Sequence, residues 1–167
     1  RTGGYLLKVD RSSGNDRTIV AGGTTMVWES PNGIDIATGL YNNQVSYVQS
    51  YFDQFYSVLQ STTWTNPVSG YRAYIDEGSW IDHHLLNMIS FNIDALRLSA
   101  FLYKPRSGRI NMGPLWDYDR TLGSQDGRDF NPRRWRSVTP DYGTEMFNTD
   151  GIFANLWYSK MFRDIDF

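Results

Sequence analysis

The chain of 167 residues is long enough for one domain with a hydrophobic core, and we expect residues 1–167 to form a single partial domain. A net charge of −2 argues against general binding to nucleic acid or to a membrane surface, and no apolar run is long enough for a membrane span. The absence of cysteine excludes disulfide bonds and thiolate zinc sites.

The first part of the chain predicts two strands and a long helix. Residues 3–10 and 24–29 have strand-like composition, and a polar loop at 12–17 lies between them. Thr38 is a candidate cap for a helix over 40–60. Apolar residues at helical spacing predict that one face of this helix packs into the core rather than lining a ligand groove: Val45, Val48, Phe52, Phe55 and Leu59.

The second part of the chain predicts two further helices around a β-hairpin, which makes the fold class α+β with about three main helices. Asp76 can cap a helix over 77–91, and residues 97–104 and 109–112 form a hairpin around a turn. A polar, arginine-rich segment at 120–148 precedes a last helix near 151–162. The residues expected to face the core are Trp80, Ile81, Leu85, Met88 and Ile89 in one helix, and Ile152, Phe153, Leu156, Trp157 and Met161 in the other.

Two acidic residues, Asp117 and Asp119, lie shortly after the second hairpin strand. Carboxylate oxygens held at a sheet edge suit an Mg²⁺ or Mn²⁺ ion that carries substrate phosphates. In an extended chain the two side chains would point to the same side, so both could reach one ion. Asp119 could equally cap a turn before Gly123, and an isolated Asp-x-Asp is more often a turn or an ion pair.

A third acid, Asp94, precedes the hairpin, so the chain has the order acid, hairpin, acid. Kinase-type phosphoryl transfer uses this order, with one Asp beside the attacking hydroxyl and a second Asp on the metal. Because a hairpin brings its two ends together, we expect Asp94 and Asp117 to face one cavity. A loop Asp that caps nearby amides is the alternative for Asp94.

The run from Tyr74 to Gly123 resembles the spore-coat CotH kinase family of atypical protein kinases. The similarity is weaker over 3–11, where the family usually carries Glu at the position of Lys8, and over 162–167. The segments that carry the resemblance are 74–76, 79–82, 85–87, 92–94, 97–99, 103–104, 108 and 112–119.

This resemblance implies the C-terminal lobe and part of the core of an atypical protein kinase. It implies Mg²⁺-dependent (or Mn²⁺-dependent) transfer of the γ-phosphoryl group of ATP to a protein serine or threonine. Asp94 would position the hydroxyl and Asp117 would hold the metal, assisted by Asp119 or Asn92. Trp116 would stack on adenine or pack in the core.

One departure from the kinase pattern concerns the second metal position. Kinase-type sites place an Asn five residues after the catalytic Asp, and this chain has Ser99 there. Asn92 or Asn87 could compensate, although Asn87 could equally be a structural hydrogen-bonding residue.

Two other groups of residues have a structural and a functional interpretation. His83 and His84 are adjacent on a helix, so they diverge by about 100° and we expect structural or surface roles. The arginine-rich loop could be a lid or hold an acidic partner, but a solvated loop paired with nearby acids is the commoner explanation. Its arginines are Arg128, Arg133, Arg134 and Arg136.

Two other functions stay open: a glycosyltransferase that holds Mn²⁺ through Asp117 and Asp119, and a non-catalytic surface module for adhesion or scaffolding. The resemblance further suggests a secreted or cell-envelope bacterial protein. It also implies that the smaller kinase lobe precedes residue 1 and that the family continues beyond residue 167. We therefore expect the isolated 167-residue fragment to be inactive or nearly so.

Overall fold

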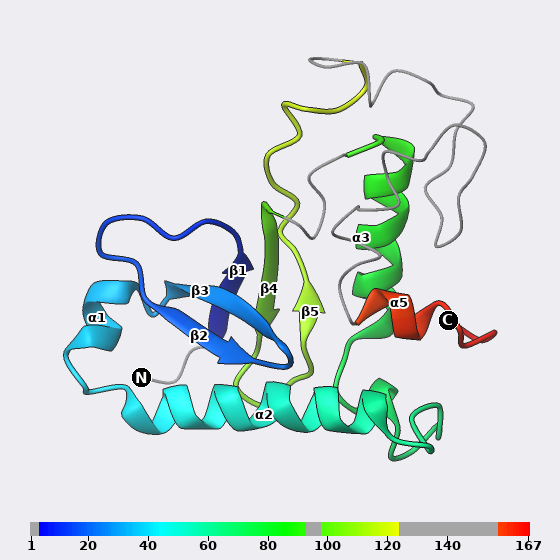
Figure 1. The fold of residues 1–167 in the computed structure, drawn as a ribbon, viewed down its shortest axis with the longest axis horizontal. Coiled ribbons are helices and arrows are strands. Elements are labelled where there is room, and N and C mark those ends of the chain that lie inside the picture. Colours follow the sequence, from blue (N-terminus) through cyan, green and yellow to red (C-terminus); the bar gives the residue numbers. More distant parts are fainter. Residues whose placement is uncertain (1–3, 93–97, 124–156) are drawn as a thin grey trace.

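The computed structural model describes residues 4–92, 98–123 and 157–167 and shows an α+β fold, as predicted (Figure 1). A five-stranded sheet has the strand order β2-β3-β1-β4-β5, and each pair of neighbouring strands is antiparallel. The strands are β1 (Tyr5–Val9), β2 (Thr18–Ala21), β3 (Thr24–Ser30), β4 (Ala100–Lys104) and β5 (Asn111–Met112).

The helices lie around this sheet, with α2 running across one end of it and α3 beside β5 (Figure 1). Within the described ranges none of the helices combines the length and the apolar character needed to cross a membrane. The helices are α1 (Gly33–Ala37), α2 (Asn42–Gln60), the 3-10 helix η1 (Tyr71–Ala73), α3 (Glu77–Ile89) and α5 (Tyr158–Met161).

Strand β1 lies at the centre of the sheet and sets the register of its neighbours. Lys8 pairs with Val27 of β3 on one side and with Phe101 of β4 on the other. The predicted strands at 3–10 and 24–29 are confirmed, but β2 between them was not predicted. It forms a tight hairpin with β3 through Gly22 and Gly23, whose φ angles of 62° and 78° suit a residue without a Cβ atom.

Helix α2 supplies one wall of the core, as its spacing predicted. Val48, Phe52, Phe55 and Leu59 are fully buried, and Phe55 packs against Trp80 at a ring-centroid distance of 5.9 Å. The predicted cap was wrong. Thr38 ends the short helix α1, where its hydroxyl donates to the carbonyl of Asp35, and α2 begins four residues later without a side-chain cap.

Helix α3 begins as predicted, because the Asp76 carboxylate accepts the Ser79 N–H at 3.0 Å. Its buried face differs from the prediction at the C-terminal end. Trp80 and Met88 are buried and Ile81 is partly buried, but Leu85 is 41% and Ile89 is 70% exposed. Two polar side chains are buried on this helix instead, His83 and Asn87, because hydrogen bonds satisfy their polar atoms.

The C-terminal segment 157–167 returns to the core. The Trp157 indole N–H donates to the carbonyl of Gly22 at 2.7 Å, and the Tyr158 hydroxyl donates to the carbonyl of Trp80 at 2.9 Å. Trp157 and Met161 are buried, as predicted for the last helix. The other core positions predicted there lie outside the described residues, as does most of the arginine-rich segment.

Candidate active site

The β4–β5 hairpin brings the residues before β4 to the residues after β5. Leu102 pairs with Met112, and the Gly113 N–H donates to the carbonyl of Phe101 at 2.8 Å. Beyond this point the Ser99 hydroxyl donates to Oδ2 of Asp117 at 2.9 Å. The two ends of the hairpin therefore meet. Asp94 itself lies outside the described residues, so its distance from Asp117 stays a prediction.

The prediction that Asp117 and Asp119 both reach one ion assumed an extended chain, and the structure does not show one there. The φ angle of Asp117 is 61°, in the left-handed region, and a turn begins at Asp119. Both side chains are exposed, so their carboxylates are accessible to a cation from solvent. Asp117 is the better placed of the two, since Ser99 fixes one of its oxygens.

Trp116 is 58% exposed, so the alternative of a core tryptophan is wrong. Its ring meets Phe101 edge-on, with ring centroids 6.1 Å apart and an interplanar angle of 76°. Phe101 was not predicted as a site residue, and the sequence signal was only its nearness to Ser99 at the start of β4. Phe101 is buried, so Trp116 alone offers an exposed aromatic ring next to Asp117, and Phe101 supports it edge-on.

Lys8 lies on the same face of the sheet as Phe101, because the two residues pair directly across β1 and β4. The Lys8 ammonium group pairs with Glu29 of β3 at 3.0 Å. Partial burial lowers the pKa of Lys8, but the hydrogen bond and negative charge of Glu29 outweigh this effect and raise the pKa overall. The cationic Lys8, paired with Glu29, thus lies beside Phe101 on this face of the sheet.

Asn92 and Asn87 are buried behind the acidic segment. The Asn92 side-chain N–H donates to Oδ1 of Asn87 at 2.9 Å, and the Tyr118 hydroxyl donates to the same oxygen at 3.1 Å. Asn87 is 1% exposed and Asn92 is 2% exposed. With two donors on its oxygen, Asn87 is a structural hydrogen-bonding residue rather than a metal ligand.

The two histidines have structural surroundings. His83 is buried, and burial together with the charge of His84 lowers its pKa to about 4, so it is neutral at pH 7. The His84 ring packs against Phe162 at a centroid distance of 4.6 Å. Among residues 4–92, 98–123 and 157–167 no group of three or more His, Cys, Asp or Glu side chains is set to hold a metal ion.

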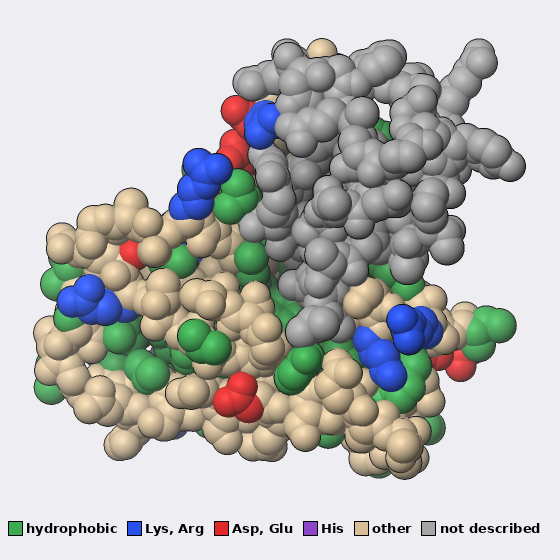
Figure 2. All heavy atoms as spheres, in the orientation of Figure 1, with side chains coloured by type: hydrophobic (Ala, Val, Ile, Leu, Met, Phe, Trp, Pro, Cys, Tyr) green, Lys and Arg blue, Asp and Glu red, His purple; other side chains and the backbone are tan. Residues whose placement is uncertain are grey.

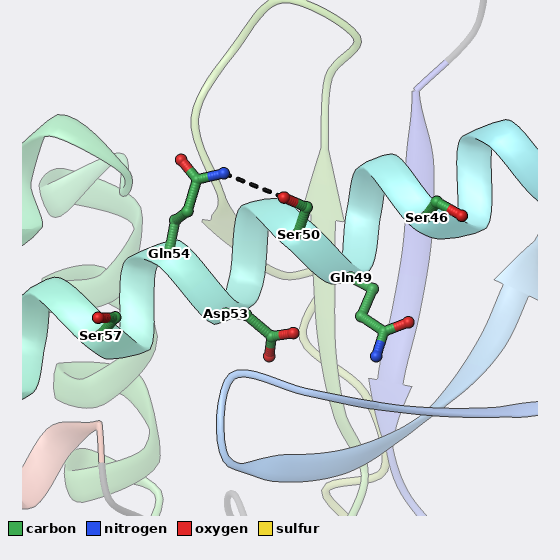
Figure 3. A pocket seen from close by; sticks show the side chains of 6 residues that line it. All are labelled: Ser46, Gln49, Ser50, Asp53, Gln54 and Ser57. Carbon is green, nitrogen blue, oxygen red and sulfur yellow. Dashed lines mark hydrogen bonds between the residues drawn. The ribbon is translucent and has the colours of Figure 1, made fainter.

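A hollow lies along α2, beside the β2–β3 hairpin. Figure 3 shows that hydroxyl and amide side chains line this open pocket of about 450 Å³. Asp53 points toward the β2–β3 hairpin and accepts the Gly22 N–H at 2.8 Å, and the surface along α2 is mostly uncharged (Figure 2). Asp53 is the one charged side chain among the six that line the hollow, so its lining has no lysine or arginine to bind a phosphate.

Comparison with known protein families identifies the chain's family. The family described as CotH kinase protein matches residues 2–165, which is nearly the whole chain. No curated protein and no solved structure matches the chain. The protein therefore belongs to the CotH kinase protein family, as the sequence resemblance predicted, and has the kinase-like character of that family.

Proposed function

We propose that the protein transfers the γ-phosphoryl group of ATP to a serine or threonine of a protein substrate in an Mg²⁺-dependent reaction. The observation that supports this proposal most is the contact of Ser99 with Asp117 at the open end of the hairpin. In kinase-type phosphoryl transfer the Asp that follows such a hairpin holds the metal.

The chemistry expected of Asp117 is electrostatic. A divalent cation bound to the ATP phosphates would neutralise charge that develops as the γ-phosphoryl group moves. The exposed Asp117 carboxylate supplies a hard oxygen ligand, and Ser99 orients it. In this proposal Asp119 or Asn92 assists at the metal.

The nucleotide base would lie on the exposed ring of Trp116, which Phe101 supports edge-on. An exposed indole face offers adenine an apolar, polarizable partner directly beside the metal ligand. Lys8, on the same sheet face, would add positive charge near the nucleotide. For the acceptor side we propose Asp94, which would orient the substrate hydroxyl and accept its proton.

The test is incorporation of phosphate from γ-labelled ATP with Mg²⁺ by the full-length protein, compared with its Asp94→Asn and Asp117→Asn variants. We expect each variant to lose at least about a hundredfold in rate, because positioning and metal charge supply most of the catalysis. Asp82→Asn is the matched control, since Asp82 is an exposed carboxylate on α3 to which the proposal gives no role.

Two results would reject the proposal. One is transfer that survives both substitutions at the rate of the control. The other is an absence of transfer together with a melting temperature that Mg²⁺ and ATP do not raise. In the second case a binding module for adhesion or scaffolding becomes the better interpretation, and a shift given by a nucleoside-diphosphate sugar instead of ATP would favour a glycosyltransferase.

A further inference from the structure

The side chain of Asn87 connects α3 to the acidic segment. It is 1% exposed, and its Nδ2 donates to the carbonyl of His83 at 2.8 Å. Since that nitrogen already has an acceptor, the amide is oriented with Oδ1 facing the other way, toward donors. Two donors meet it there, Nδ2 of Asn92 at 2.9 Å and the hydroxyl of Tyr118 at 3.1 Å.

The two donors belong to the two segments that carry the candidate site. Asn92 lies three residues beyond the end of α3, and its backbone N–H also bonds the carbonyl of Asn87 at 2.9 Å. Tyr118 lies between Asp117 and Asp119 and is half-buried, and burial raises the pKa of its hydroxyl, which stays a donor at neutral pH. One buried amide oxygen therefore holds both segments to the same helix.

A second connection supports the same arrangement from the backbone. The Leu122 N–H donates to the carbonyl of Ser90 at 3.1 Å, at the C-terminal end of α3. The Thr121 hydroxyl donates to the carbonyl of Tyr118 at 2.7 Å and closes the turn between these anchors. The segment 118–122 is thus fixed to α3 at both ends, and Asp117 extends from one of them.

We propose that Asn87 is a positioning residue that fixes the Asp117 carboxylate relative to the end of α3 through its bonds to Tyr118 and Asn92. Its catalytic consequence rests on the proposed phosphotransfer, but the positioning itself does not. Misplacing a catalytic group by a fraction of an ångström slows reactions markedly, so loss of this amide lowers kcat more than it raises KM.

The experiment compares Asn87→Ala with Met88→Ala in the full-length protein. Met88 is the next residue of α3 and is 3% exposed, so its truncation also costs core packing but removes no side-chain amide. We measure amide hydrogen exchange over residues 115–121 without nucleotide, and the dissociation constant of Mn²⁺ by electron paramagnetic resonance. Asn87→Ala should speed exchange there and raise the Mn²⁺ constant by about fivefold, and Met88→Ala should do neither.

Tyr118→Phe removes the hydroxyl that bonds Asn87, and also the bond of that hydroxyl with the Asn92 side chain, but keeps the ring. Its effects on exchange and on Mn²⁺ binding should be in the same direction and smaller, and most of each effect should be lost in the Asn87→Ala background, where the Asn87 acceptor is gone. Tyr51→Phe is the matched control, since it removes an equally half-buried hydroxyl that bonds the Tyr74 carbonyl at 3.1 Å.

Three results would overturn the positioning role: unchanged exchange over 115–121 in Asn87→Ala, equal changes in Met88→Ala, or additive effects of Tyr118→Phe and Asn87→Ala. If Asn87→Ala does not fold, the comparison of Tyr118→Phe with Tyr51→Phe decides alone. Because exchange is measured without ATP, the experiment tests the positioning role even if the protein transfers no phosphate. Failure of the proposed function is detected separately, by the phosphate-incorporation assay.

Discussion

The hydroxyl of Ser99 donates to Oδ2 of Asp117 at 2.9 Å, and both residues have left-handed backbones, with φ angles of 55° and 61°. A residue with a Cβ atom adopts this conformation at a cost of roughly 1 kcal/mol. Ser99 precedes β4 and Asp117 follows β5, so the two side chains meet at the open end of the hairpin, where the chain enters and leaves the sheet. A hydrogen bond to a carboxylate is among the stronger ones and offsets part of this cost.

Removal of the Ser99 hydroxyl should weaken metal binding more than it weakens the fold. In Ser99→Ala we expect the Mn²⁺ dissociation constant to rise by about three- to tenfold, because the Asp117 carboxylate loses the donor that orients it. Isothermal titration with Mn²⁺ in the presence of a non-hydrolysable ATP analogue measures this change.

Ser99→Gly separates the hydroxyl from the backbone. Glycine accepts a positive φ without strain, so this variant should be more stable toward urea than Ser99→Ala but should bind Mn²⁺ equally weakly. If Ser99→Gly binds the ion as the unchanged protein does, the hydroxyl has no part in holding the carboxylate.

Much of the fold was predictable because it follows from periodicity and turn chemistry. The core face of α2, the Asp76 cap of α3 and the β4–β5 hairpin are all local signals. The strand β2 was missed because it is four residues long and lies beside a polar loop, although Gly22-Gly23 was a usable hairpin signal. The apolar pattern of α3 was misleading at Ile89, because the buried face of the helix includes the hydrogen-bonded His83 and Asn87, which hydropathy does not predict.

The site was only partly predictable, because its geometry depends on backbone conformations that the sequence pattern does not report. Asp-x-Asp predicts neighbouring carboxylates, but an extended chain was the wrong premise, since Asp117 has a positive φ. In the sequence, Ser99 was a departure from the kinase pattern, because it stands where an Asn was expected. Only the tertiary contact shows that its hydroxyl reaches Asp117. Asn87 likewise acquires its role from long-range partners such as Tyr118.

Trp116 should report nucleotide binding through its fluorescence. It is 58% exposed, whereas Trp28, Trp80 and Trp157 are at most 1% exposed. We expect ATP with Mg²⁺ to quench emission through stacking on the exposed indole, and Trp116→Phe to lose most of this change while binding ATP about three- to tenfold more weakly. A quench of unchanged size in Trp116→Phe would place the nucleotide away from this surface.

The stability of the fold should fall as the pH is lowered through the range set by His83. Its folded-state pKa is about 4, against about 6.5 in an unfolded chain, because burial and the charge of His84 disfavour the protonated ring. The unfolded state therefore binds the proton more readily. The contribution of the neutral His83 to stability is complete above about pH 6.5 and is lost progressively down to about pH 4. At pH 5 this loss amounts to about 2 kcal/mol.

Urea denaturation at pH 7.5 and at pH 5 measures this loss, and His83→Gln provides the control. A glutamine does not titrate, so the difference in unfolding free energy between the two pH values should be smaller in the variant, whatever its absolute stability. An equal pH dependence in both proteins would assign the loss to other groups and not to His83.

The C-terminal segment is held to the rest of the domain by Asp164, which is 8% exposed. Its carboxylate accepts hydrogen bonds from Arg72 at 2.7 Å and from the Tyr71 hydroxyl at 3.0 Å. Burial raises the pKa of Asp164, but these bonds and the Arg72 charge outweigh it and lower the pKa overall. Asp164→Ala should therefore reduce the unfolding free energy by about 3 kcal/mol, since it leaves a half-paired guanidinium in a largely buried place.

Tyr71→Phe and Asp166→Asn complete this test. Tyr71→Phe removes one of the bonds to Asp164 and keeps the charge pair, so it should cost only about 1 kcal/mol. Asp166→Asn changes an exposed carboxylate of the same segment and should cost less than about 0.5 kcal/mol. A loss in Asp164→Ala no larger than in Asp166→Asn, by urea denaturation at pH 7.5, would show that the segment is held by its aromatic packing alone. The contact of Tyr158 with Trp80, at a centroid distance of 5.3 Å, would then be the anchor that remains.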